Sequence, residues 1–117
     1  MSDIDPGVLE QLAADVTAED LRAVISASEA DLLRTTGVLL AAAQAGDTPT
    51  ILRTAHIIAG VASIVGARSL EQDVRALMVS EATAAALTVP DATRIAASAR
   101  AVIRAVHDLM TARGYDA

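Results

Sequence analysis

Alanine dominates this chain, with 27 alanines among its 117 residues. Alanine has the highest helix propensity, and leucine, arginine, glutamate and glutamine supply much of the remainder. Only three prolines and six glycines interrupt the chain, and no segment alternates apolar and polar residues as a strand does. The composition therefore predicts an all-α protein, and the length predicts a single domain over residues 1–117.

Composition also argues against several classes of function. The chain has no cysteine, which excludes disulfides, thiol catalysis and zinc–thiolate sites. An aromatic content of 1% and a formal net charge of -6 argue against a nucleic-acid partner, which needs stacking platforms or a basic surface. The acidic start does not resemble a signal peptide, and no apolar run approaches the ~20 residues that span a bilayer. We therefore expect a cytoplasmic protein with no membrane partner.

Capping signals and apolar periodicity divide the chain into five predicted helices. An Asp-Pro pair starts a short first helix over residues 6–15, the second helix covers residues 17–45, and the third covers residues 49–65. A fourth helix carries an apolar stripe over residues 70–78, and a last helix starts within residues 88–91. Short connections make consecutive helices antiparallel neighbours. The sequence thus predicts an up-down-up-down four-helix bundle with a short extra N-terminal helix.

The third predicted helix contains the residues that indicate a function. At 100° per residue, one face collects the apolar residues that must point to the core: Ile51, Ala55, Ile58, Ala62 and Val65. His56 lies away from that face. It shares its own side of the helix with four residues: Leu52, Arg53, Gly60 and Ser63. Gly60, one turn after His56, leaves a bare patch beside the imidazole, and Arg53 is close enough in sequence to place a guanidinium nearby.

An isolated, accessible imidazole on a rigid helix is suited to group transfer. Neutral imidazole is nucleophilic near physiological pH. The chain has two histidines, without the H-x-x-x-H or H-E-x-x-H spacing of a zinc site, and no cysteine or clustered serine accompanies His56. A hydrolase triad and a metal centre are therefore not predicted. Such an imidazole can still accept and release a transferable group.

The segment A-H-I-I-A-G-V-A-S-I-V-G-A-R-S-L, residues 55–70, resembles the phosphorylation motif of histidine-containing phosphotransfer (HPt) domains. That motif is roughly A-H-x-L-K-G-x-A-x-x-x-G-A-x-x-L, and seven residues match it: Ala55, His56, Gly60, Ala62, Gly66, Ala67 and Leu70. The remaining helices agree with the family in number and length. The resemblance implies a four-helix bundle whose histidine accepts a phosphoryl group from a response-regulator receiver aspartate and passes it to another receiver.

The resemblance also implies how the work is divided between this chain and its partners. His56 would be the phosphoacceptor, Gly60 would give clearance, and Arg53 would be a candidate contact to the phosphoryl group. Four further residues are candidates for the partner-binding surface: Leu52, Ala59, Ser63 and Ile64. The chain would hold no cofactor, because the receiver supplies Mg²⁺. The partners would be receiver domains, with a hybrid histidine kinase as a further candidate, and the protein would be a monomeric phosphocarrier rather than an independent enzyme.

Two departures from the family pattern leave an alternative open. The family usually has lysine three residues after the histidine, where this chain has Ala59, and a polar residue on the next helix, where the matching turn has Met78. Arg53 and Arg68 are candidates to compensate for the lysine. The alternative is an HPt-shaped interaction module that docks on a receiver or histidine kinase and regulates it without carrying phosphate.

Two other interpretations are less favoured. Histidine-kinase dimerisation domains normally have an acidic residue directly after the phosphorylated histidine, whereas Ile57 follows His56 here. The second histidine, His107, lies at the edge of the apolar stripe of the last helix, and we expect it to have no functional role.

Overall fold

A computed structural model describes residues 4–115, and within this range every regular element is a helix. The six helices are, in chain order, α1 (Pro6–Asp15), α2 (Ala18–Ala45), α3 (Thr48–Val65), α4 (Arg68–Leu77), α5 (Glu81–Ala85) and α6 (Val89–Ala112). The prediction of an all-α protein is confirmed.

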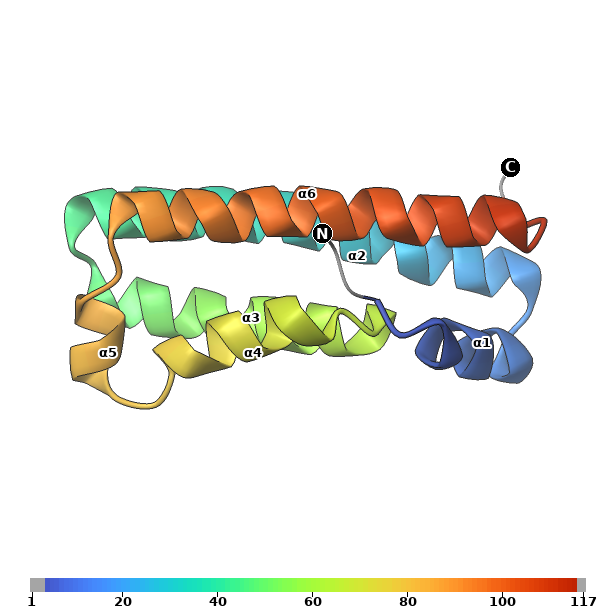
Figure 1. The fold of residues 1–117 in the computed structure, drawn as a ribbon, viewed down its shortest axis with the longest axis horizontal. Coiled ribbons are helices and arrows are strands. Elements are labelled where there is room, and N and C mark those ends of the chain that lie inside the picture. The colour runs from blue at the N-terminus through green and yellow to red at the C-terminus, as the bar shows by residue number, and fades with distance from the viewer. Residues whose placement is uncertain (1–3, 116–117) are drawn as a thin grey trace.

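The long helices lie side by side along the length of the molecule, and α2, α3 and α4 alternate in direction (Figure 1). α2 packs against α3 and α6, and α3 packs against α4. α2 and α6 extend beyond the end of α3, and α1 lies in the space beside them (Figure 1). α3 therefore has neighbours on two sides and one side that faces outward.

The helix boundaries follow the capping signals. Five helices begin where a side-chain oxygen accepts a hydrogen bond from a backbone N–H of the first turn: Asp5, Thr17, Asp47, Ser80 and Thr88. Gly46 and Gly66 end α2 and α3 in the left-handed conformation, with φ of 67° and 75°. The predicted limits of the first three helices are correct to within one residue.

The fourth predicted helix is shorter than expected. α4 has 10 residues and ends at Leu77, and a separate helix of 5 residues, α5, follows it. The Ser80 side chain caps α5 by accepting a hydrogen bond from the backbone N–H of Thr83 at 3.1 Å. This cap starts a new helix instead of continuing the old one. The described residues thus contain three long helices, of 28, 18 and 24 residues, and not four.

The core contains apolar side chains from all six helices. The predicted core face of α3 is confirmed, because all five of its residues are buried. On α2, buried hydroxyl groups interrupt the apolar stripe, and each donates to a backbone carbonyl one turn earlier. Ser28 donates to Val24 at 2.8 Å, and Thr36 donates to Leu32 at 2.7 Å. These polar groups therefore do not enter the core without a partner.

α3 is also the most apolar long helix. It has 18 residues with a mean hydropathy of 1.3, so its length and composition would suffice to cross a membrane. The expectation that no segment reaches that length is therefore wrong by this measure. A core helix meets the same criterion, and α3 makes contacts with α1, α2, α4 and α5.

Candidate functional site

The outward side of α3 presents the predicted histidine to solvent. His56 is exposed, and so is Gly60 one turn later. The His56 side chain has no hydrogen bond or ion pair with any residue in the described range. A Cβ atom built on Gly60 would have no neighbouring atom within 4 Å. Packing within this chain therefore does not require the glycine, and open space lies beside the imidazole.

Exposed isoleucines flank this space. Ile57 is 40% exposed and Ile64 is 46% exposed, and they lie one turn before and one turn after Gly60. Ser63 is exposed on the same side, and Leu52 is half-buried. We call the exposed residues of this side the His56 face: Arg53, His56, Ile57, Gly60, Ser63 and Ile64.

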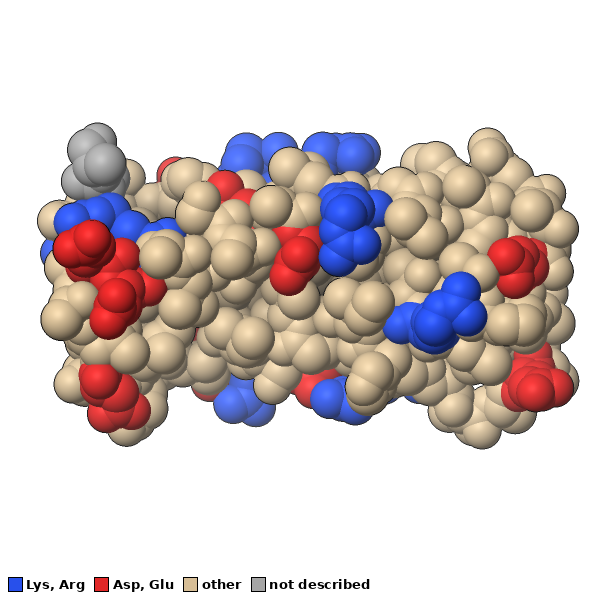
Figure 2. All heavy atoms as spheres, turned by 180° about the vertical axis from the view of Figure 1, so that it is seen from behind, with Lys and Arg blue, Asp and Glu red and all other residues tan. Residues whose placement is uncertain are grey.

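Ser63 and Ile64 are thus exposed as predicted, and Ile57 is an exposed neighbour that the predicted partner-binding set omitted. Its spacing of three residues before Gly60 is the signal that would have identified it. Figure 2 shows the side of the molecule on which α2 and α3 lie, and uncharged atoms cover most of it. Apolar side chains with few charges between them are typical of a surface that binds another protein.

Arg53 lies on the His56 face but is turned toward the start of α3. Its guanidinium donates a hydrogen bond to Thr50 Oγ1 at 3.1 Å, and the Thr50 hydroxyl donates to Asp47 Oδ2 at 2.7 Å. The Thr50 hydroxyl, the Thr50 amide and the charge of Arg53 together hold the pKa of Asp47 below its ordinary value. The structure therefore does not bring Arg53 to His56.

Ala59 is 1% exposed, so the prediction that it belongs to the partner-binding surface is wrong. α3 and α4 are joined by a tight turn at Gly66 and Ala67, and Ala59 precedes that turn by as many residues as Val74 follows it. The two side chains are therefore level with each other, and both are buried. The small alanine lets α4 pack closely against α3, and a lysine at this position would not reach solvent without displacing α4.

The other two positions considered as substitutes for family residues lie elsewhere. Arg68 donates a hydrogen bond to Asp5 Oδ2 at 2.8 Å, which ties α1 to the start of α4. Met78 follows the last residue of α4 and packs, half-buried, against the core. His107 lies against Glu29 of α2, with its Nε2 atom next to a carboxylate oxygen. Nothing in these contacts gives His107 a role in the candidate site.

A hollow of about 320 Å³ runs between the end of α3 and α4, close to the His56 face. We call it the α3–α4 hollow, and it is lined by Val8, Ser63, Gly66, Arg68, Glu71, Gln72 and Arg75. Ser63 stands two turns after His56 on the same side of α3. Through Ser63, the hollow brings Arg75 of α4 beside the His56 face, a neighbour that reading α3 alone did not reveal.

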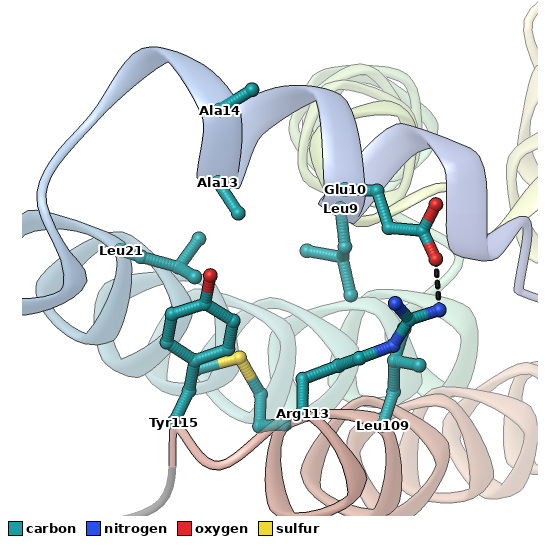
Figure 3. A pocket seen from close by; sticks show the side chains of 9 residues that line it. Leu9, Glu10, Ala13, Ala14, Leu21, Leu109, Arg113 and Tyr115 are labelled. Carbon is teal, nitrogen blue, oxygen red and sulfur yellow. Dashed lines mark hydrogen bonds and ion pairs between the residues drawn. The ribbon is translucent and has the colours of Figure 1, made fainter.

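A second hollow lies between α1, α2 and α6 (Figure 3). It has a volume of about 450 Å³ and a mostly apolar lining, and an ion pair between Glu10 and Arg113 bridges its edge. None of the predicted site residues lines it. Its size falls within the range of ligand pockets, but its two charged groups neutralise each other.

Residues 4–115 contain no group of three or more His, Asp or Glu side chains that could hold a metal ion.

Comparison with known proteins finds no match: no family model fits the chain, and neither the curated proteins nor the solved structures include a similar one. The structure nevertheless separates the seven motif residues by role. Five of them are buried and serve packing or the turn: Ala55, Ala62, Gly66, Ala67 and Leu70. His56 and Gly60 are exposed. Any chemical meaning of the motif therefore depends on these two residues.

Proposed function

We propose that this protein is a histidine phosphotransfer protein in a two-component phosphorelay. His56 accepts a phosphoryl group from the aspartate of one response-regulator receiver domain and donates it to another. The observation that carries the proposal is the pair of His56 and Gly60, an imidazole without a partner among the described residues beside a glycine at which an added Cβ would meet no atom within 4 Å. A mid-helix glycine costs about 1 kcal/mol relative to alanine, and nothing in the packing of this chain offsets that cost.

The transfer step is an in-line displacement at phosphorus. An unprotonated nitrogen of neutral His56 attacks the aspartyl phosphate of the receiver, so that a P–N bond forms while the acyl P–O bond breaks and the aspartate carboxylate is restored. The other ring nitrogen keeps its proton. Passing the group to a second receiver reverses the step, with P–N cleavage and formation of a new acyl phosphate. Alignment and charge neutralisation dominate such reactions, and the receiver supplies Mg²⁺.

The proposal includes the finer architecture and the setting of the protein. α2, α3, α4 and α6 would act as an up-down four-helix bundle that holds His56 rigidly, and the His56 face would dock on the receiver. The protein would work as a cytoplasmic monomer and as a phosphocarrier, since part of the reaction centre belongs to its partner. A rigid helix supports this function because transfer depends on holding the nucleophile in one orientation.

The direct test uses receiver domains labelled with radioactive phosphate on aspartate. Incubation with this protein should move label to the chain as an acid-labile, base-stable phosphohistidine. The His56→Gln variant should take up no label, whereas His107→Gln, which changes the other histidine, should take up as much as the unchanged protein. Label that persists in His56→Gln would contradict the proposal.

A second candidate function is the interaction module that docks on a receiver or histidine kinase without carrying phosphate. One observation favours it: Arg53, the cation closest in sequence to His56, is turned away toward Thr50. In the same experiment this function predicts a stable complex with receivers and no label on the chain. Absence of both label and complex would exclude both functions.

A further inference from the structure

A phosphoryl group on His56 would carry close to two negative charges and would need a cation beside it. α3 does not provide one. Arg53 is bonded toward the start of the helix, and the side chain at position 59 is a buried alanine. The cation of α3 is thus directed away from His56 in this structure, and the neighbouring helix α4 is the next source of positive charge.

α4 has two flanks, and the contacts show where each one points. Asp73 lies on the flank that faces α6, because its carboxylate is 3.5 Å from Arg94 of that helix. Arg75 lies on the other flank, because it lines the α3–α4 hollow together with Ser63. Ser63 is on the His56 face, so this flank of α4 runs alongside that face.

α3 and α4 are neighbouring helices joined by the turn at Gly66 and Ala67, so counting residues from this turn shows which residues of the two helices lie opposite each other. His56 precedes this turn by as many residues as Leu77 follows it. Arg75 is therefore less than one helical turn from the level of His56. Its side chain is about half exposed and holds Glu71 at 2.7 Å in a surface ion pair on its own helix. Such pairs contribute only about 0.3–0.5 kcal/mol, so the guanidinium is free to exchange Glu71 for a stronger anion.

From this placement we infer that Arg75 is the residue of this chain that binds the phosphoryl group carried by His56. The inference rests on the proposed function and assigns the missing cation to α4 instead of α3. On phosphorylation, the guanidinium leaves Glu71 and turns along the α3–α4 hollow to contact phosphoryl oxygens. Arg75 thus stabilises the phosphorylated state without taking part in bond making.

The test needs no receiver. In a His107→Gln background, where His56 is the sole histidine, phosphoramidate transfers its phosphoryl group to the ring: the P–N bond to ammonia breaks and a P–N bond to imidazole forms. The ³¹P chemical shift is then followed against pH. The cation of Arg75 favours the deprotonated form of phosphohistidine, so Arg75→Ala should raise the titration midpoint by about half a pH unit, as expected for one cation near a titrating group in water. Arg75→Lys should restore most of the shift, and the matched control Arg53→Ala should change the midpoint less than Arg75→Ala does.

The outcomes separate this inference from the proposed function. An unchanged midpoint in Arg75→Ala, or a larger change in Arg53→Ala, overturns the assignment to Arg75 even where receivers still label His56. A shifted midpoint that lysine restores supports the assignment, whether or not a given receiver transfers. Failure of phosphoramidate to modify His56 shows that the ring is not reactive and overturns both.

Discussion

The two sides of α3 carry small residues for different reasons. On the inward side, Ala55, Ala59 and Ala62 are buried where α3 meets other helices. On the outward side, Gly60 is exposed and a Cβ there would touch nothing. A small buried residue marks a place where helices approach closely. Gly60 lowers stability without serving the packing of the chain, and under the proposed function it keeps the surface beside His56 clear for a receiver.

The largest effect that this comparison predicts is on folding. Ala59→Lys places a long charged side chain between α3 and α4, so the free energy of unfolding should fall by about 2–4 kcal/mol. Urea unfolding followed by circular dichroism measures this change. Ser63→Lys, on the exposed side one turn later, is the matched control and should change stability by less than about 0.5 kcal/mol. Equal stabilities of the two variants would show that the two sides of α3 do not differ.

A smaller effect of opposite sign is expected on the outward side. Gly60→Ala should raise the free energy of unfolding by about 0.5–1 kcal/mol, because alanine favours the helix and has open space around it. Gly37 in α2 is also exposed, and an added Cβ there would meet nothing within 4 Å, so Gly37→Ala should stabilise to the same extent. The two variants should differ in function, since only Gly60→Ala should slow transfer from a phosphorylated receiver. Equal transfer rates in both would remove the functional reason for Gly60.

The smallest effect concerns the start of α3, which belongs to neither side. Interactions with Thr50 and Arg53 place the pKa of Asp47 below its ordinary 3.8 in the folded state. Its contribution to stability is therefore fully present above the unfolded value and is lost as pH falls through the folded value. Asp47→Asn removes this charge while keeping a capping side chain. Thermal unfolding should show the unchanged protein to be more stable near pH 7, and the difference should shrink in strong acid; a constant difference would contradict this account.

The sequence predicted most of the helices because their signals are local. Thr17 and Asp47 cap α2 and α3, and Gly46 and Gly66 end them, as the side chains and backbone freedom of these residues dictate. The division between α4 and α5 was missed although Ser80 supplies a cap of the same kind. The apolar periodicity of α4 continues to Met78, one residue past the end of the helix at Leu77, so periodicity alone did not mark where α4 ends.

The candidate site was predicted only in part, since periodicity gives the outward side of one helix but not what stands next to it. The exposure of His56, Gly60 and Ile64 follows from their angle on α3. The burial of Ala59 and the position of Arg75 depend on where α4 packs, which is a property of the tertiary structure. The side chain of Arg53 could turn toward Thr50 or toward His56, since each lies three residues away along the helix. Sequence spacing alone does not decide between these two orientations.

Gly66 has a consequence for how this protein should be handled. A Cβ there would lie 2.9 Å from the Asp5 carbonyl oxygen, and the Asp5 amide donates to the Gly66 carbonyl at 2.8 Å. α1 is thus fastened to the corner that sets how α4 is aligned with α3. A purification tag or fusion partner joined ahead of α1 would stand close to this corner. Protein prepared to measure the reactivity of His56 should therefore carry any tag at the other terminus.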